Sequence, residues 1–133
     1  MKNKSIDVLM VVAGVKPCKV SIIGTHKNLK YLVNPNLSLM TDIEVIMIED
    51  DVALICNSEG ALLNLKGNRK VGNNIIAGTF FIVGVKDGRI ASLSKEKAEK
   101  YYKRFEKIEI YSDSEVSASY WDFCLDKLND IIE

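Results

Sequence analysis

Two apolar runs constrain the fold of this chain more than any other feature of the sequence. Val52 to Cys56 is uninterrupted, and the run from Thr79 to Val85 is apolar between its threonine and Gly84. An apolar run of this length without alternation is typical of a strand that is buried on both faces of a sheet. The stretch between the two runs, Asn57 to Thr79, is polar by contrast.

Segments of alternating polarity or high β-propensity predict further strands, bounded by Gly, Pro, Asn and Asp. These strands are expected at Ser5 to Val12, Lys19 to Ile23, Asp42 to Ile48, Ala61 to Leu65, Arg89 to Ala91 and Ile108 to Tyr111. The first two are predicted to form a hairpin, and Asp87-Gly88 is predicted to be a second hairpin turn. The residues from Lys66 to Asn74, with two Gly and three Asn, are predicted to form a loop.

Three helices are predicted from their caps and apolar spacing. The first is capped by Thr25 and ends near Val33, before Pro35. The second follows Ser94 and ends near Lys107, and the third begins with the S-x-x-E capping box from Ser112 to Glu115. Apolar residues of the third helix repeat at Val116, Tyr120, Cys124, Leu128 and Ile131.

This order of elements predicts an α+β fold with a mainly antiparallel sheet. A short helix is expected near the N-terminal third, and two C-terminal helices are expected to pack on the sheet. Because the strands come first and the last two helices follow, we expect the helices on one face. Residues 1–133 show no linker or internal repeat and are interpreted as one domain.

Charge and cysteine usage exclude several classes of function. The chain has 18 Lys+Arg and 18 Asp+Glu, a net charge of zero, so direct nucleic-acid binding is not expected. Its three cysteines are scattered in apolar surroundings without a CxxC pair, which is typical of reduced thiols in a cytoplasm. The N-terminus has no signal-peptide pattern, and no apolar stretch is long enough to cross a membrane.

No motif supplies a catalytic centre, a metal site or a cofactor site. His26 is the only histidine, and it falls in the first turn of a short polar helix. The glycines of residues 72–84 match neither a P-loop nor a dinucleotide fingerprint. A metal-dependent nuclease that uses Asp50, Asp51 and Glu59 is one alternative, against the simpler interpretation of a solvated acidic turn.

The polar stretch from Asn57 to Thr79 is the predicted ligand or partner site. Its amides offer paired donors and acceptors, and the guanidinium of an arginine is a planar fork suited to phosphate or carboxylate. The predicted site residues are Asn57, Glu59, Asn68, Arg69 and Thr79. The alternative is that the asparagines only satisfy turn geometry.

The last helix carries a second candidate surface for binding a partner. Tyr120, Trp121 and Phe123 cannot all point in one direction from a helix, so we expect part of this aromatic surface to form a partner or dimer interface. The alternative is burial of all three side chains within the domain.

The sequence resembles a family of small proteins with a domain of unknown function, found in phages, plasmids and conjugative elements, mainly of Firmicutes. The resemblance covers residues 5–107 and rests on C-N-S-E-G at 56–60, N-R at 68–69 and I-I-A-G-T-F at 75–80. It implies no established activity. It marks Asn57, Glu59, Gly60, Asn68, Arg69, Gly78 and Thr79, of which Gly60 and Gly78 are expected for reasons of backbone geometry. Residues 112–133 fall outside it.

These observations lead to two functional hypotheses. The first is a non-enzymatic counter-defence protein of a phage or mobile element, which binds a nucleotide-like signal or a host defence protein. A nucleotide would need a preformed pocket, expected at the interface of a homo-oligomer, with Arg69 on phosphate. The alternative is a protein–protein inhibitor or adaptor that acts through the C-terminal helix without a small ligand.

Overall fold

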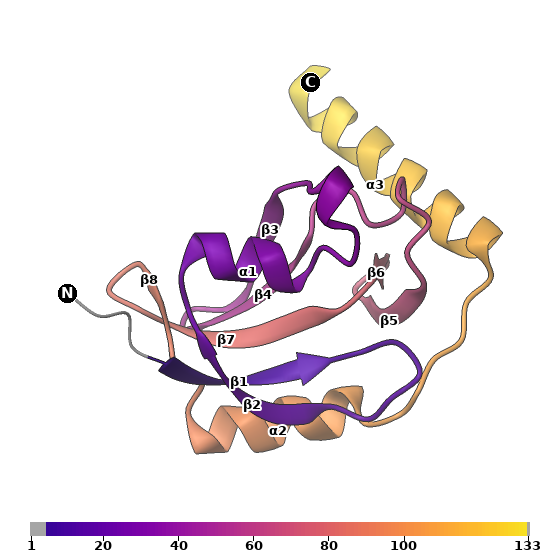
Figure 1. Cartoon of the computed structure of the whole chain (residues 1–133). Helices are drawn as coiled ribbons and strands as arrows, with labels where there is room; N and C mark the ends of the chain where they lie inside the picture. The colour runs from indigo at the N-terminus through magenta and orange to yellow at the C-terminus, as the bar shows by residue number, and fades with distance from the viewer. Residues whose placement is uncertain (1–4, 133) are drawn as a thin grey trace.

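The computed structural model of the chain describes residues 5–132, with side chains described through residue 125. Its elements, in chain order, are β1 (Ser5–Val11), β2 (Cys18–Ile23), α1 (His26–Leu32), the 3-10 turn η1 (Leu37–Leu39), β3 (Ile43–Glu49), β4 (Val52–Asn57), β5 (Gly67–Val71), β6 (Asn74–Ala77), β7 (Phe80–Lys86), β8 (Arg89–Ala91), α2 (Lys95–Phe105) and α3 (Asp113–Ile132). Figure 1 shows their arrangement.

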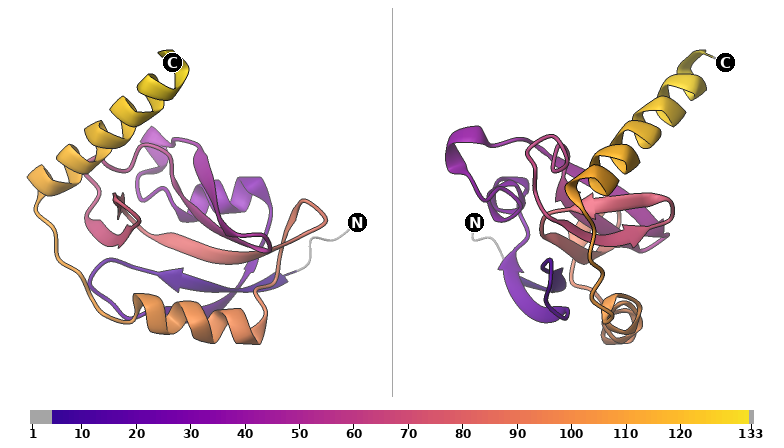
Figure 2. Two further views of the ribbon diagram at one scale, coloured as in Figure 1. Left: turned by 180° about the vertical axis from the view of Figure 1, so that it is seen from behind. Right: turned by 90° about the vertical axis from the view of Figure 1, so that its right-hand side faces the viewer.

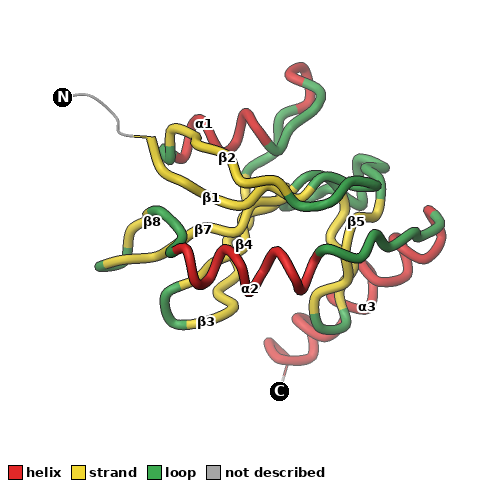
Figure 3. The backbone as a smooth tube through the Cα atoms, turned by 90° about the horizontal axis from the view of Figure 1, so that it is seen from below, coloured by secondary structure: helices red, strands yellow, loops and turns green. Residues whose placement is uncertain are grey.

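The main sheet is antiparallel and has the strand order β2-β1-β7-β4-β3, with β8 paired to the end of β7. The hairpin of β5 and β6 forms a separate two-stranded sheet. β4 and β7, which contain the two apolar runs, therefore lie at the centre, and β2 and β3 lie at the edges. Figure 3 looks at the sheet from the side of α2, with β1 and β2 toward one edge and β3 toward the other.

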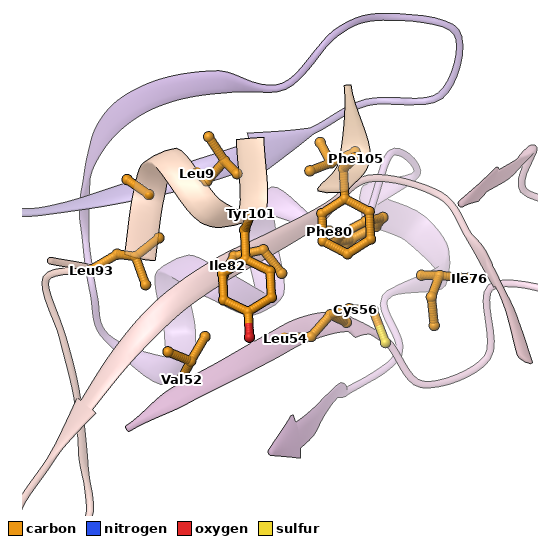
Figure 4. Close-up of a cluster of buried hydrophobic side chains, with 12 residues drawn as sticks. Leu9, Val52, Leu54, Cys56, Ile76, Phe80, Ile82, Leu93, Tyr101 and Phe105 are labelled. Carbon is orange, nitrogen blue, oxygen red and sulfur yellow. The ribbon is translucent and has the colours of Figure 1, made fainter. Parts of the chain in front are cut away.

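Each face of the central strands has its own apolar core, because successive side chains of a strand point to opposite faces. On one face Leu54 and Ile82 pack with Tyr101 and Phe105 of α2 (Figure 4). The aromatic pair Phe80 and Phe105 meets edge to face, with ring centroids 5.3 Å apart. On the other face Ala53, Ile55, Phe81 and Val83 pack against Leu29 and Val33, at the end of α1.

The predicted fold class is confirmed, whereas the expectation that all helices share one face is wrong. α1 covers one face of the sheet and α2 covers the other. The physical reason lies in β4 itself: all six of its residues are buried, so both of its faces require cover. Among the described residues, α3 contacts mainly β6, and Figure 2 shows it extending away from the rest of the fold.

The caps form as their sequences predict. The side chain of Thr25 accepts a hydrogen bond from the Asn28 amide, and that of Ser94 accepts one from the Lys97 amide, both at 3.2 Å. The capping box of α3 is reciprocal: the Ser112 amide donates to Glu115 at 2.9 Å, and the Glu115 amide donates to Ser112 Oγ at 3.1 Å.

Three local predictions differ from the structure. Residues 61–65 form turns instead of a strand, with the Leu65 amide bonded to the Gly60 carbonyl at 2.9 Å and Asn64 in the left-handed region at φ 57°. The predicted loop of residues 66–74 contains β5, because Gly72, with φ 62°, permits a two-residue hairpin turn before β6. Residues 108–111 form no strand.

Within residues 5–132, no helix is both long enough and apolar enough to cross a membrane.

Candidate functional site

The polar stretch from Asn57 to Thr79 leaves the end of β4 and returns to the main sheet at the start of β7. Between these points it forms the turns of residues 58–64 and the β5–β6 hairpin. Its position follows from the apolar strands on either side, which fix both of its ends in the sheet. The hairpin contacts α3 and, through the hydrogen bond from Arg69 Nε to the Phe105 carbonyl, the end of α2, and Ile76 contributes to the core on the α2 side.

Asn68 and Arg69 lie in the interior of this lobe, and both side chains are 0% exposed. The Asn68 amide donates to the carbonyl oxygens of Val11 at 2.8 Å and Gly78 at 3.0 Å. Asn68 therefore ties the hairpin to the end of β1 and to the start of β7.

The guanidinium of Arg69 is enclosed by oxygen acceptors of the chain itself. Its Nε donates to the Phe105 carbonyl at 2.9 Å, Nη1 to Asn68 Oδ1 at 2.8 Å and Nη2 to the Val15 carbonyl at 2.8 Å. Desolvation lowers the pKa of Arg69, and the charge of Glu109 opposes this shift. An arginine used in this way holds three segments together and offers no open fork to an external phosphate.

Asn57 is a second internal junction, with 5% of its surface exposed. Its Oδ1 accepts hydrogen bonds from Thr41 Oγ1 at 2.7 Å and from the Glu59 amide at 2.8 Å. Its Nδ2 donates to the Val33 carbonyl at 3.2 Å and to Asn34 Oδ1 at 3.0 Å. These bonds join the end of β4 to the segment that follows α1.

The five predicted site residues therefore do not converge on one cavity. Asn57 lines a pocket of about 40 Å³ between β4, β6 and α3. Thr79 is half-buried and lines a groove of about 230 Å³ on another side, together with Leu65, Lys66 and Pro35. Glu59 is exposed, and Asn68 and Arg69 line neither cavity.

The three aromatic residues of α3 separate as helical spacing requires. Tyr120 and Phe123 are half-buried and line the 40 Å³ pocket with Asn57, so the two predicted surfaces meet there. Trp121 is 58% exposed, and so is Leu125 at 56%. Because Val116 and Ser119 are buried, α3 packs by one side and leaves Trp121 and Leu125 on another.

Residues 6–106 match the family model described as a domain of unknown function, DUF3846. The chain belongs to the DUF3846 family. Searches of curated proteins and of solved structures return no match to this chain. The matched range ends just after α2, so α3, with Trp121 and Leu125, lies beyond the part of the chain that the DUF3846 model covers.

Two glycines of the DUF3846 domain are required by geometry, as the sequence predicts. A Cβ on Gly60 would stand 2.4 Å from the carbonyl oxygen of Ala77, a backbone atom that cannot move aside cheaply. Gly78 has φ 89°, in the left-handed region that favours glycine. Both residues therefore serve the packing of the turns against the start of β7.

The acidic residues of the nuclease alternative do not form a site. Asp51 precedes β4 and Glu59 follows it, so the length of the strand separates them. Across the residues that the structure describes, no three His, Cys, Asp or Glu side chains are grouped to hold a metal ion. Cys56 is buried, and desolvation raises the pKa of its thiol to about 12, which disfavours the nucleophilic thiolate.

Leu125, Val45 and Met47 are not among the predicted site residues, although all three are large apolar side chains at least half exposed. The signal for Leu125 was present, because it lies four residues after Trp121 and so shares its side of a helix. Val45 and Met47 alternate in a predicted strand, but the sequence does not tell which strand lies at the edge of the sheet.

Proposed function

We propose that this DUF3846 protein acts by binding a partner protein through the exposed apolar side of α3. The observation that carries the proposal is the exposure of Trp121 and Leu125 on a helix that already packs by its other side. Tryptophan is enriched at the energetic centres of protein interfaces, and a neighbouring leucine adds apolar area. The projection of α3 beyond the rest of the fold makes this side accessible (Figure 2).

The interior positions of Asn68, Arg69 and Asn57 favour this function over nucleotide binding by the polar stretch. The three side chains use their donors on acceptors within the chain. The pocket beside Asn57 measures about 40 Å³, whereas small-molecule pockets typically measure about 300–1,000 Å³. A nucleotide would therefore have to break these hydrogen bonds and open the lobe.

The biological setting that we propose is counter-defence in a phage or mobile element, in the cytoplasm of the host. The support is the resemblance of the sequence to small proteins of such elements. The partner would be a host defence protein, which this chain blocks without catalysis.

The test is affinity capture from host extract, followed by reconstitution with the purified partner. Trp121→Ala combined with Leu125→Ala should weaken binding by at least about thirtyfold, since a central tryptophan contributes at least about 2 kcal/mol. Tyr31→Ala is a matched control, because Tyr31 is an aromatic residue of α1 with similar exposure, 52%. Equal loss of binding in both variants, or none in the α3 variant, would refute the proposal.

A second candidate function is the binding of a small anionic, nucleotide-like ligand in the groove of Thr79. This groove is about 230 Å³, largely apolar, and contains Lys66 and the Thr79 hydroxyl as groups that could contact a phosphate. Native mass spectrometry with a panel of cyclic nucleotides tests it. Binding that Lys66→Ala and Thr79→Val abolish, and that Trp121→Ala leaves intact, would favour this function over the first.

A further inference from the structure

β3 forms one edge of the main sheet. Its inner side pairs with β4 from Ile43 to Glu49, and no other strand among the described residues pairs with it. An edge strand presents backbone N–H and C=O groups along its outer side, which makes it a template for another strand. The outer side of β3 can therefore form backbone hydrogen bonds with a β-strand of another chain.

The middle of β3, from Val45 to Met47, lacks the charged residues, prolines and bulges that protect edge strands from pairing. Its seven residues, IEVIMIE, contain no Lys, Arg, Pro or Gly. Val45 is 50% exposed and Met47 is 51% exposed, on the face of the sheet that α1 covers only in part. The irregularity in its pairing with β4 lies between Met47 and Glu49, at one end of the strand.

The opposite edge provides a comparison within the same sheet. β2 exposes Lys19 and Ser21 in its middle, where β3 exposes Val45 and Met47. Lysine on an edge strand is a common means of preventing edge-to-edge association. Of the two edges, β2 thus has the character of a protected edge, and β3 has that of an interface.

We propose that β3 pairs antiparallel with β3 of a second copy of this chain, so that the two main sheets form one continuous sheet. The two-fold axis would pass beside Ile46, and this register is centred on Val45, Ile46 and Met47, before the irregularity at the end of the strand. It places Val45 opposite Met47 of the other copy, so that all four exposed apolar side chains meet on one face. Such a contact is isologous and closes as a dimer.

The charges of β3 are compatible with this register. Glu44 lies opposite Ile48 of the other copy, and Glu49 lies beyond the pairing irregularity, outside the central register, so no two carboxylates face each other directly. Like charges directly opposite would destabilise the pairing, whereas apolar cross-strand pairs stabilise it. Glu49 is also neutralised within its own copy by Lys97 and Lys100.

The first test is the mass of the full chain in solution, measured by analytical ultracentrifugation at micromolar concentrations. We expect a dimer, and we expect Val45→Lys or Met47→Lys to raise its Kd by about tenfold or more, because each lysine occurs twice in the interface. Ile23→Lys on β2, where Ile23 is 37% exposed, is the matched control and should remain dimeric. Circular dichroism of each variant verifies that it is folded.

The second test fixes the register by cysteine cross-linking, in a chain with Cys18→Ser and Cys124→Ser. Directly opposite residues have Cβ atoms about 4.5–5.5 Å apart, close to the distance that a disulfide bridges. A mixture of Val45→Cys and Met47→Cys chains should therefore cross-link under mild oxidation. Neither variant should cross-link efficiently alone.

Three outcomes would overturn the proposal. One is a monomeric wild-type chain. Another is a dimer that persists with Val45→Lys and is lost with Trp121→Ala and Leu125→Ala, which would place the contact on α3. The third is efficient cross-linking of Val45→Cys alone or of Met47→Cys alone, which would require a different register. The partner-binding function of α3 would survive the first and third results, so the two proposals can fail separately.

Discussion

At the scale of single residues, Arg69 is the most unusual side chain of the fold. It is a cation with no exposed surface, and the groups that its guanidinium contacts are carbonyl oxygens and an amide oxygen. An arginine keeps its charge in a protein, so its burial is tolerable only because these acceptors surround it. Arg69 therefore acts as a structural cross-link between β5, the end of α2 and the β1–β2 connection.

We predict that Arg69→Ala lowers the free energy of unfolding by about 3–5 kcal/mol, because it leaves buried carbonyls unsatisfied and creates a cavity. Arg69→Lys should also destabilise the fold, since one ammonium group cannot span the same acceptors. Urea unfolding at neutral pH measures both. Arg89→Ala, at an exposed arginine in β8, is the control and should change stability by less than about 0.5 kcal/mol. A change as small for Arg69→Ala would show that the cross-link is dispensable.

The sequence could locate Asn68 and Arg69 as notable residues, but it could not show which way they face. A polar side chain between apolar strands has the same pattern whether its partner is a ligand or a backbone carbonyl. The partners of these two residues lie far along the chain, at Val11, Val15 and Phe105, with separations of 57, 54 and 36 residues. Only the tertiary fold brings them together.

At the scale of elements, a cluster around Glu49 fastens the end of β3 to α2. The Glu49 carboxylate accepts hydrogen bonds from Lys97, Lys100 and Tyr101, all on α2. The bonds from Lys97, Tyr101 and Lys100 lower the pKa of Glu49 from 4.5 to about 2. Desolvation, and then the bond to Glu49, raise the pKa of Tyr101 to about 12, so its hydroxyl remains a donor.

This pKa shift predicts how the stability of the fold depends on pH. A carboxyl whose pKa is lower in the folded than in the unfolded state stabilises the fold above the unfolded value, near 4.5, and this contribution is lost as pH falls through about 2. Glu49→Gln should therefore lower the Tm near neutral pH, and its difference from wild type should shrink between these two values. Thermal unfolding followed by circular dichroism across this range measures it.

Glu99→Gln is the control for that experiment, because Glu99 is an exposed carboxylate on the same helix. Its Tm should follow that of the wild type at each pH. A Tm difference between Glu49→Gln and wild type that stays constant down to the lowest pH would show that the cluster stabilises the fold by packing, not by charge.

The sequence predicts an element correctly where neighbouring residues alone carry the signal. It predicts less well where the same residues suit two different structures. The caps Thr25, Ser94 and Ser112 marked the starts of helices because a side-chain oxygen near a free amide is a local feature. The β5–β6 hairpin was missed because Gly72-Asn73 suits both a loop and a two-residue hairpin turn. Its pairing is held by contacts of Arg69 and Ser119 outside the hairpin.

At the scale of the whole molecule, the order of elements did not determine which face each helix covers. The uninterrupted apolar run of β4 indicated a strand buried on both faces, and this implied cover on both sides. Placement of all helices on one face conflicts with that run, and the run prevails because exposed apolar area on a central strand costs free energy. The short helix α1 therefore packs opposite α2.

The match to the family ends at residue 106, and this predicts that the rest of the molecule folds without α3. α3 is joined to the rest mainly through the hairpin: Val116 is buried near Gly67, and Ser119 Oγ accepts a hydrogen bond from the Ile75 amide at 2.8 Å. Among the α3 residues whose side chains the structure describes, none belongs to either apolar core of the main sheet. A chain that ends after Tyr111 should therefore fold, with an unfolding free energy lower by about 3 kcal/mol from the lost burial and hydrogen bonding.

Hydrogen exchange can locate this loss. In the shortened chain, amide protection should fall in β5 and β6, most of all at Ile75, while β4 and β7 remain protected because their cores are intact. Ser119→Ala in the full chain is the matched control, since it removes the hydrogen bond to Ile75 and keeps the helix. If protection were lost throughout the main sheet, α3 would be part of the cooperative fold. If protection persisted in β4 and β7, α3 would be an addition to a domain that folds without it. In that case α3 could present Trp121 and Leu125 to a partner without supporting the main sheet.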